Sequence, residues 1–387
     1  MTISQERKQS VVDRLFKGVQ QLVSSKNIWL YDGEAQMTGD RTIAVQTKEG
    51  DDISLSAEHV ILATGSKPRE LPGFPIDGDL IIGSDQVLEL TQLPAHAAII
   101  GGGAIGCEFA SMLTDLGTQV TILESAERLI PGADPDIAKS LQRAFKKRGI
   151  RTITNATLGG QTLLDTGVTV HLSDGTDIDV EKVIVSVGRT ALSEGLGLEN
   201  TTVEVDSEGC VVVDQYCRAT ASGVYAVGDL IATPQLAHVG FAEAMLAVQN
   251  IRDEKASSIN YERTAWAIYC HPEVAYAGLT ETQAHEAGLE IVVSKHRFIG
   301  NARAAIHGEN EGMVKVIAER RRDGKAGRIL GVHLIGPWVT EQLSQGYMAI
   351  NWELEIDQIS KFIQPHPTFS EVFGEAVLEL AGRTLHG

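Results

Sequence analysis

The amino-acid sequence predicts an α/β protein built from more than one domain, and three observations support this prediction. A glycine-rich loop at residues 101–106 stands between an apolar run and a helical pattern. Further short apolar runs end in glycine turns, as buried strands do. From about Tyr261 the pattern changes to strands followed by helices, which indicates a separate α+β domain. The length of 387 residues suffices for two or three domains.

The glycine-rich loop has the strand–loop–helix–strand setting of a dinucleotide-binding unit. Residues 97–100 and 119–123 are the expected strands, and residues 104–116 are the expected helix. Three glycines define the loop: Gly101, Gly103 and Gly106. The first permits the tight turn, the second lets the backbone approach a pyrophosphate, and the third lets the helix pack close to the strand. Glu124, at the end of the second strand, can accept hydrogen bonds from a ribose, whereas the alternative is a glycine-rich turn in an ordinary βαβ unit.

The residues before the loop alternate between helical and strand patterns. Apolar side chains at helical spacing predict an amphipathic helix over 5–24. Short alternating runs divided by Asp and Gly turns predict a small antiparallel sheet over 28–55. Residues 59–65 form an expected buried strand that ends in a glycine turn, and the proline-rich stretch 67–75 is a connector.

Beyond the loop, the same signals predict helices over 137–148 and 235–251, and strands over 183–187 and 223–227. The α+β domain has its own expected elements, three strands followed by two helices: 265–269, 313–318, 329–335, 341–351 and 369–380.

Composition narrows the class of protein. Apolar residues make up 43% and charged residues 22%, as in a soluble globular protein, and the net charge of −18 argues against nucleic acid and anionic membranes as partners. No apolar stretch is long enough to span a bilayer, and the N-terminus lacks the apolar core of a signal peptide. The cysteines form no CxxC pair and predict reduced thiols in a cytoplasmic protein without a metal site: Cys107, Cys210, Cys217 and Cys270.

Two strand ends are candidates for a second nucleotide site. Ala63, Thr64 and Gly65 end one expected strand, and Gly228 and Asp229 end another. In open α/β sheets, ligands lie at the carboxyl ends of strands. An aspartate there can accept a hydrogen bond from a sugar or ribityl hydroxyl, although each segment alone also suits a plain turn.

Two further polar groups are candidates for chemistry. His366 stands between two prolines, and a nearby carboxylate such as Glu371 would orient its imidazole as a general base. Thr368 with Glu371 also fits a capping box, which is the structural alternative. Glu108, one turn into the loop's helix, is either a solvated helix residue or a carboxylate near a nicotinamide. His238, at the start of an expected helix, suits a structural role.

In this order, the motifs resemble those of the pyridine nucleotide–disulfide oxidoreductase family, most of all its dihydrolipoamide dehydrogenases. The resemblance covers essentially the whole chain. Its motifs are Ala63-Thr64-Gly65-Ser66, the Gly101 loop with Gly106 and Glu108, Val187-Gly188-Arg189, Val224-Tyr225-Ala226-Val227-Gly228-Asp229, Leu236-Ala237-His238, His271-Pro272-Glu273-Val274 with Gly278-Leu279-Thr280, and His366-Pro367-Thr368 with Glu371. It implies an FAD-binding domain (1–90 and 218–258), an inserted NAD-binding domain (91–217), both Rossmann-like, and a C-terminal domain (259–387) that forms a homodimer.

The resemblance also implies roles for single residues. Asp229 would bind the ribityl chain of FAD, with the backbone around Ala237 and His238 against the flavin ring. The residues implied to hold NAD are Gly101, Gly103, Gly106, Glu124 and Gly188. Glu108 would lie on the nicotinamide and flavin side. His366, oriented by Glu371, would act as acid and base toward a cysteine pair on the other subunit.

Two features of the sequence qualify these implications. Glu124 would repel a 2′-phosphate, which favours NAD, whereas Arg128 keeps NADP as the alternative. The family's first glycine loop, its Cys-x-x-x-x-Cys pair and the lysine downstream do not occur in the sequence. We therefore expect a chain whose N-terminal portion is absent, whose FAD-binding domain is incomplete, and which is inactive as a disulfide reductase by itself.

The resemblance implies oxidation of dihydrolipoyl groups by NAD through FAD. The implied partner is the dihydrolipoyl domain of a 2-oxoacid dehydrogenase or glycine-cleavage type complex. Two alternatives remain: a soluble pyridine nucleotide transhydrogenase or another reductase of the family, and a non-catalytic, NAD-binding dimeric protein.

Overall fold

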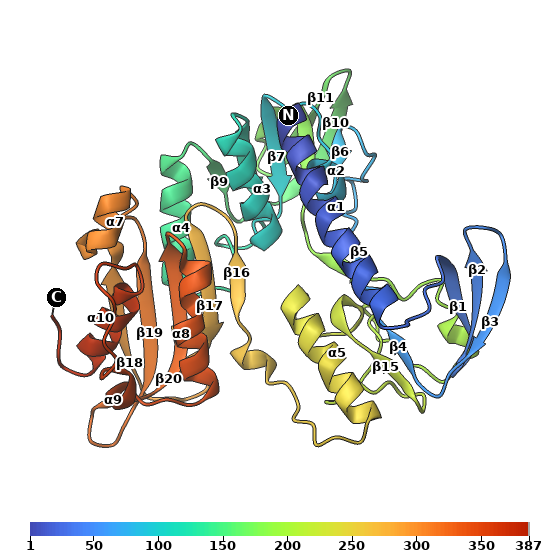
Figure 1. Ribbon diagram of the computed structural model, residues 1–387. Coiled ribbons are helices and arrows are strands. Elements are labelled where there is room, and N and C mark those ends of the chain that lie inside the picture. Colours follow the sequence, from blue (N-terminus) through green and yellow to red (C-terminus); the bar gives the residue numbers. More distant parts are fainter. Residues whose placement is uncertain (386–387) are drawn as a thin grey trace. The chain divides into compact units, whose positions relative to one another are not determined.

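A computed structural model describes residues 1–385, which divide into two compact units, each made of two separate stretches of chain (Figure 1). Unit 1 comprises residues 1–69 and 189–261, and unit 2 comprises residues 70–188 and those from 262 onward. Strands and helices alternate in both units, so the α/β class predicted from the sequence is observed.

Unit 1 begins with α1 (Thr2–Ser25) and an antiparallel sheet of β1 (Gly33–Gly39), β2 (Thr42–Thr47) and β3 (Asp52–Ser56). Two small sheets then join distant segments: β4 (Val60–Leu62) pairs in parallel with β15 (Val224–Ala226), and β5 (Ser66–Pro68) pairs antiparallel with β14 (Arg189–Ala191). The remaining helical elements are η1 (Leu198–Asn200), η2 (Gly228–Leu230) and α5 (Ala237–Ile251). The predicted helix 5–24 and the predicted sheet within 28–55 are confirmed.

The core of unit 1 lies between β4, β15 and α5, where Leu62, Ala226 and Leu246 are buried. The helix α1 differs, because none of its residues is buried. Its apolar stripe includes Leu15, 63% exposed, and Phe16, 60% exposed. A stripe of this kind marks a face that suits a packing partner.

The first half of unit 2 contains a parallel five-stranded sheet in the order β6-β13-β7-β8-β9. Its strands are β6 (Ile81–Ile82), β7 (His96–Ile100), β8 (Gln119–Leu123), β9 (Arg151–Ile153) and β13 (Lys182–Val185). The accompanying helices are α2 (Ser84–Leu88), α3 (Ala104–Asp115) and α4 (Pro135–Lys147). An antiparallel sheet is inserted before the last strand: β10 (Leu158–Leu164), β11 (Gly167–Leu172) and β12 (Asp177–Val180).

The second half of unit 2 is an antiparallel sheet in the order β16-β17-β20-β19-β18. Its strands are β16 (Trp266–Ile268), β17 (Glu273–Gly278), β18 (Ile291–Arg297), β19 (Met313–Arg320) and β20 (Ala326–Gly336). Helix α8 (Val339–Asn351) packs on β17 and β20, and α10 (Glu371–Leu380) packs on β18 and β19. The shorter helical elements are η3 (Tyr261–Arg263), α6 (Glu281–Glu286), η4 (Phe298–Gly300), α7 (Ala302–His307) and α9 (Ile356–Ile359). The predicted α+β character of this region is confirmed.

One hydrophobic core joins the two halves of unit 2. Buried Leu141 of α4 and Ile99 of β7 belong to the same cluster as Tyr276 of β17 and Ile335 of β20. The parallel sheet and the antiparallel sheet therefore share apolar contacts rather than only a linker.

A buried ion cluster reinforces this junction. The ammonium of Lys315 on β19 lies 2.8 Å from both carboxylate oxygens of Asp134, the N-cap of α4. It also lies 2.8 Å from Asp136 and 2.6 Å from Glu281. Lys315 is 1% exposed and Asp134 is fully buried. Burial lowers the pKa of Lys315, but the hydrogen bonds to the three carboxylates outweigh this and raise it, so the lysine stays charged.

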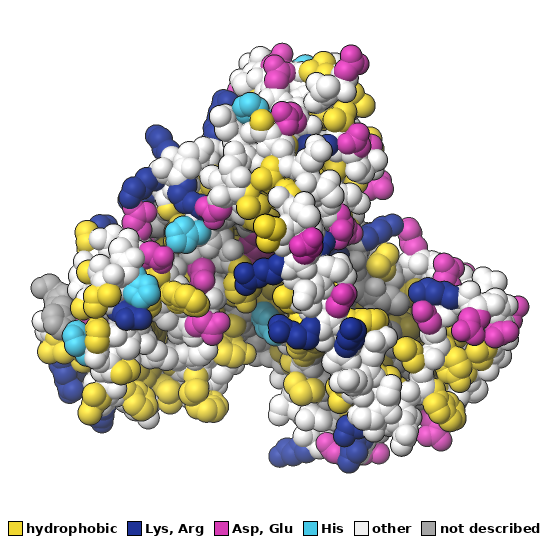
Figure 2. Space-filling model, turned by 45° about the horizontal axis from the view of Figure 1, so that its top comes forward, with side chains coloured by type: hydrophobic (Ala, Val, Ile, Leu, Met, Phe, Trp, Pro, Cys, Tyr) yellow, Lys and Arg dark blue, Asp and Glu magenta, His cyan; other side chains and the backbone are white. Residues whose placement is uncertain are grey.

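The surface agrees with the composition. Asp and Glu side chains are scattered over the face seen in Figure 2, in keeping with the net charge of −18. Among the helices of residues 1–385, none combines the length and the apolar character needed to cross a bilayer.

Candidate functional site

The glycine-rich loop joins β7 to α3, and Gly103 is the N-cap of that helix. Gly101 has a φ of +105°, and a Cβ there would lie 2.4 Å from the Ser186 carbonyl oxygen. A Cβ on Gly106 would lie 1.9 Å from the carbonyl oxygen of Gly101. A Cβ on Gly103 would meet no atom within 4 Å. Packing inside the protein thus requires two of the glycines, while the third borders open space, as a bound pyrophosphate needs.

Glu124 closes the loop from the end of β8. Its Oε2 accepts a hydrogen bond of 2.6 Å from the backbone N–H of Gly102, and its Oε1 accepts one of 2.7 Å from Ala126. The side chain is only 7% exposed. The carboxylate is therefore held against the loop in the position where a ribose contact is expected.

Two neighbours complete this region. The guanidinium of Arg128 donates to Glu127 (2.5 Å) and to the carbonyl of Pro131 (3.2 Å), so both of its terminal nitrogens have protein partners. Ser186, after β13, donates to the carbonyl of Gly101 at 3.0 Å. This bond brings the segment that ends in Gly188, whose φ is +109°, beside the loop. The donors, the open glycine and the buried acid fit a dinucleotide such as NAD.

Glu108 lies on α3 and its Oε1 accepts a 2.8 Å hydrogen bond from the backbone N–H of Tyr269. Burial raises the pKa of this carboxyl, with the hydrogen bond acting in the opposite direction. The residue therefore ties α3 to the segment after β16, a role that the sequence did not predict.

The two strand ends of unit 1 come together because β4 and β15 are parallel neighbours. Asp229 follows β15, and the hydroxyl of Ser66 donates to its Oδ2 at 2.6 Å. Arg189 donates to the same hydroxyl at 2.6 Å and to the Ser66 carbonyl at 2.7 Å. Ser66 and Arg189 belong to quoted motifs, but their bond to each other spans 123 residues, which no local pattern reveals.

A buried glutamate holds the turn before Asp229. Glu243 of α5 is fully buried and accepts a 2.7 Å hydrogen bond from the N–H of Gly228, while the hydroxyl of Tyr261 donates to its other oxygen at 3.0 Å. Glu243 was not predicted as a site residue from the sequence. Its signal was an acid in the middle of the apolar run 239–248 of α5.

On the other strand end, Thr64 donates from its hydroxyl to the Leu192 carbonyl at 2.8 Å, and Gly65 has a φ of +74°. Ala63 precedes them directly after β4. The helix predicted over 235–251 begins at Ala237 rather than at residue 235, because Leu236 is the extended N-cap, and His238 is the second helical residue. These residues fit the ribityl and ring side of a flavin, whereas no glycine loop for its pyrophosphate precedes residue 101 in the sequence.

His366 and Glu371 form a dyad in unit 2. His366 Nδ1 lies 2.8 Å from Glu371 Oε1, and Glu371 Oε2 accepts a 2.7 Å hydrogen bond from the backbone N–H of Thr368. The imidazole is 68% exposed and the carboxylate 19% exposed. Because an ionised carboxylate only accepts, Nδ1 donates, and in the neutral imidazole Nε2 then carries the lone pair.

The capping-box alternative holds only in part. Helix α10 begins at Glu371 with Ser370 as N-cap, and the hydroxyl of Thr368 donates to the Pro365 carbonyl instead of capping the helix. The glutamate serves both the turn and the histidine. The predicted helix 369–380 accordingly starts two residues later than expected.

The four cysteines are free. Burial raises the pKa of Cys217 and of Cys270 to about 12, and it raises the pKa of Cys107 and Cys210 as well. Thiols of this kind are poor nucleophiles, because the thiolate is the reactive form.

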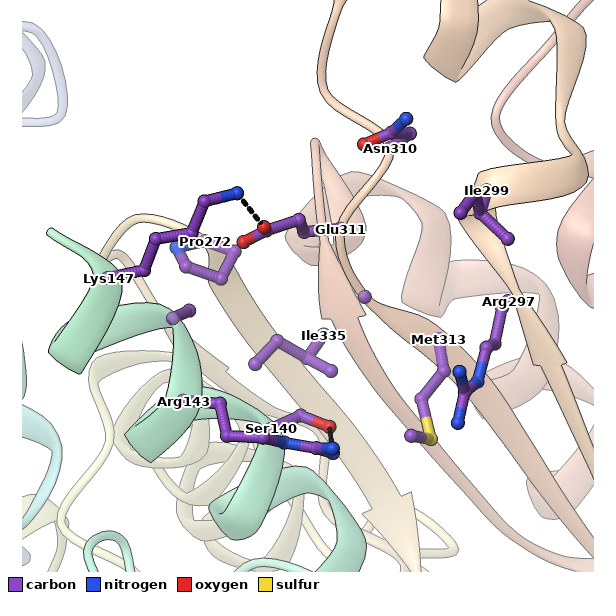
Figure 3. A pocket seen from close by; sticks show the side chains of 12 residues that line it. Ser140, Arg143, Lys147, Pro272, Arg297, Ile299, Asn310, Glu311, Met313 and Ile335 are labelled. Atoms are coloured by element: carbon purple, nitrogen blue, oxygen red, sulfur yellow. Dashed lines mark hydrogen bonds and ion pairs between the residues drawn. The ribbon is translucent and has the colours of Figure 1, made fainter.

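A further cavity of about 390 Å³ lies between α4 and the antiparallel sheet (Figure 3). Arg143 of α4 faces Met313 across it, and Lys147 pairs with Glu311 at its rim. None of the predicted site residues lines this cavity.

Comparison with known proteins identifies the class. Residues 3–244 match the family described as pyridine nucleotide-disulphide oxidoreductase, and residues 264–377 match the dimerisation domain of that family. The chain therefore belongs to the pyridine nucleotide-disulphide oxidoreductases, enzymes that use FAD and a pyridine nucleotide.

The chain is also similar to individual members of this family. The chain is 38% identical to a dihydrolipoyl dehydrogenase of Bacillus subtilis, over 99% of this chain and 82% of the relative. It is 34% identical to dihydrolipoyl dehydrogenase 3 of Pseudomonas aeruginosa, over 98% and 81% respectively. The solved structure of LpdA from Mycobacterium tuberculosis superposes with a TM-score of 0.90 at 25% identity, covering 97% of this chain and 82% of that one. The HOCl-induced flavoprotein disulfide reductase RclA from Escherichia coli gives 0.88 at 27%, covering 96% and 84%. These likenesses confirm the predicted reductase architecture with its C-terminal dimerisation domain.

Proposed function

We propose that this chain provides the NAD-binding and acid–base parts of a dihydrolipoyl dehydrogenase, which oxidises a dihydrolipoyl dithiol and reduces NAD. The observation that carries the proposal is the pairing of His366 with Glu371 at 2.8 Å. Such a pair serves thiol–disulfide chemistry, because a dithiol must lose protons as it becomes a disulfide. A reductase without a thiol substrate has no comparable need.

Each group then has a distinct task. The Nε2 atom of His366 accepts a thiol proton, and Glu371 stabilises the resulting imidazolium. The loop around Gly103 and the carboxylate of Glu124 bind the pyrophosphate and a ribose of NAD. Asp229, fixed by Ser66, binds a ribityl hydroxyl. FAD, when bound, supplies the transfer of electrons from the dithiol couple to NAD as hydride.

The proposal includes one restriction: residues 1–387 alone do not turn over as a disulfide reductase. Their cysteines have raised pKa values and lack the family's Cys-x-x-x-x-Cys spacing, so they do not supply the redox disulfide. We infer that residues 1–387 supply neither the redox disulfide nor the FAD pyrophosphate loop. The apolar stripe of α1 is exposed in these residues, a surface that suits a packing partner.

We further propose a homodimer in the cytoplasm that acts on the dihydrolipoyl domain of a 2-oxoacid dehydrogenase or glycine-cleavage type complex. A set of exposed apolar side chains on the dimerisation domain supports the dimer: Trp338, Tyr347, Met348, Trp352, Phe362 and Ile363. Burying such side chains between two copies removes apolar surface from water.

The test compares two proteins. Residues 1–387, and the same residues preceded by a flavin loop and Cys-x-x-x-x-Cys pair taken from the Bacillus subtilis relative, are assayed for dihydrolipoamide-dependent reduction of NAD. We expect NADH binding in both and turnover only in the second. Turnover by residues 1–387 alone would contradict the restriction, and no turnover by a yellow, flavin-loaded second protein would contradict the proposed reaction.

Two other functions give different outcomes. A soluble transhydrogenase would exchange hydride between nicotinamides without a dithiol, and the His366–Glu371 pair disfavours it. A non-catalytic NAD-binding dimer agrees with the unreactive cysteines. It predicts NADH binding without a flavin spectrum, and no turnover even after the flavin loop and cysteine pair of the Bacillus subtilis relative are added.

A further inference from the structure

We propose that Asn301 is a positioning residue for the His366–Glu371 pair. It acts through the carbonyl group of Thr368, in the turn between the two. The inference rests on the proposed acid–base role of this pair. In the hydrogen bonds described below, Asn301 contacts neither the imidazole of His366 nor the carboxylate of Glu371. It fixes the backbone that aims the carboxylate at the imidazole.

The turn that carries the pair is exposed and depends on few anchors. Residues 365–367 are all exposed. The N–H of Thr368 donates to Glu371, and the carbonyl of the same residue accepts a 2.8 Å hydrogen bond from the Asn301 side-chain amide. The two peptide groups flanking Thr368 are therefore both held. A rotation of that residue would break the contact with Glu371.

Asn301 is itself fixed. It is 8% exposed, and its Oδ1 accepts a 2.9 Å hydrogen bond from the N–H of Ala304 as the N-cap of α7. Its backbone N–H donates to the carbonyl of Phe298 at 2.9 Å. The cap requires an acceptor and Thr368 requires a donor, which settles the orientation of the amide. Aspartate would satisfy only the cap, and serine is too short to reach both groups.

Aromatic contacts hold the same turn independently. The ring of Phe369 lies 6.3 Å from that of Phe298 and 5.3 Å from that of His307. These contacts keep the turn packed on η4 and α7 when the amide is removed. Changing Asn301 should therefore disturb the aim of Glu371 rather than unfold the domain.

Substitutions can distinguish the role of Asn301 as N-cap of α7 from its role as donor to the Thr368 carbonyl. Asn301→Ser keeps a good N-cap without a charge but loses the donor to Thr368. Asn301→Asp also keeps the cap and loses the donor. Asn301→Ala loses both. If the residue only caps α7, the first two variants behave like the parent protein.

The first measurement is NMR of residues 1–387 with isotope-labelled histidine, which needs no turnover. His366 is assigned by its loss in His366→Gln. We expect the parent ring to carry its proton on Nδ1, with slow exchange. Asn301→Ser and Asn301→Asp should accelerate that exchange by about tenfold, the equivalent of one lost hydrogen bond. Glu371→Gln sets the limit for a fully broken pair.

Two controls report on the fold. His333 is fully buried, with its Nε2 2.9 Å from the Leu279 carbonyl oxygen, and its ring signals should not change in any variant. Asn200→Ser removes a side-chain amide to carbonyl bond of the same kind, to Met37 at 3.2 Å in unit 1, and should leave His366 unchanged. A parent-like His366 in Asn301→Ser would overturn the proposal.

The second measurement uses the flavin-loaded protein described above. Asn301→Ser should lower kcat for dithiol oxidation and alter its pH profile, with KM for NAD unchanged. If the pair has no part in dithiol oxidation, His366→Gln keeps full activity while the NMR effects persist. That outcome contradicts the proposed function and leaves the positioning of the pair intact. An unchanged NMR spectrum contradicts the positioning itself.

Discussion

The proposed NAD region of unit 2 and the proposed flavin side of unit 1 both lie at the ends of strands, but they are built in different ways. The NAD region is local in sequence. Its loop, its helix and Glu124 fall within about thirty residues, and the N–H of Gly102 in the loop donates to that acid. The flavin side is assembled from distant segments, since Asp229 depends on Ser66, 163 residues away.

The two regions also differ in what surrounds them. The NAD region rests on a core shared with the antiparallel sheet and on the buried Lys315 cluster. In unit 1, by contrast, α1 leaves its whole apolar stripe exposed. A nucleotide site built on a buried core should form by itself, whereas one beside an exposed apolar surface should be less stable until that surface is covered. The following changes test this contrast.

The largest effect is expected from Lys315→Met. Removing one partner of a buried ion cluster leaves uncompensated carboxylates and costs about 3–5 kcal/mol. Chemical unfolding should show the loss, and hydrogen exchange should place it in unit 2. The control is Lys295→Met, whose side chain is 45% exposed and pairs with Asp136; exposed pairs contribute about 1 kcal/mol or less. Because Lys295 pairs with two of the same carboxylates, equal effects of the two variants would show that the burial of Lys315 adds nothing to the cluster.

Substitutions of two loop glycines should distinguish an effect on stability from an effect on NADH binding. Gly106→Ala places a Cβ 1.9 Å from the carbonyl oxygen of Gly101, so the loop must shift, at a cost of about 1–3 kcal/mol and with loss of NADH binding. Gly103→Ala meets no atom within 4 Å and should leave stability unchanged while weakening NADH binding. Calorimetric titration and thermal unfolding measure both quantities. Full NADH affinity in Gly103→Ala would remove this loop from the binding site.

Glu124→Gln should weaken NADH binding by roughly 10- to 100-fold, because an amide cannot accept from both Gly102 and Ala126 and hydrogen bonds to a charged group contribute about 1.5–3 kcal/mol. Preference for NADH over NADPH should fall as the negative charge disappears. Glu127→Gln, a neighbouring acid 73% exposed at its side chain, is the control and should bind NADH as the parent does. A similar loss in both variants would indicate a general effect of charge.

The same contrast explains how far sequence reasoning reaches. The glycine loop and its flanking elements were predictable because strand, turn and helix signals follow one another directly. The amphipathic helix α1 was predictable from its period alone, since periodicity does not require a partner. The His366–Glu371 pair was predictable because its members are only five positions apart in the sequence.

Long-range polar contacts were not predictable. Asp134 and Lys315 lie 181 residues apart, and neither stands in a pattern that announces the other. Arg189 and Ser66 likewise meet only after β14 pairs with β5. The role of the Asn301 amide was not predictable for the same reason. It joins the N-terminus of α7 to the turn before α10, and these segments meet only in the folded domain.

The smallest effect is expected on the flavin side. Ser66→Ala removes a hydroxyl that bonds Asp229 and Arg189, but the guanidinium already lies 3.6 Å from that carboxylate and can replace the lost contact. The expected destabilisation is about 1 kcal/mol or less. Hydrogen exchange of the β4 and β15 peptides measures it, with Ser193→Ala as the control, since that hydroxyl donates to the Gly209 carbonyl at 2.6 Å away from Asp229. If Ser66→Ala instead destabilised unit 1 as much as Lys315→Met destabilises unit 2, the strand-end network would stabilise its unit as strongly as the Lys315 cluster does. The contrast between the two regions would then be wrong.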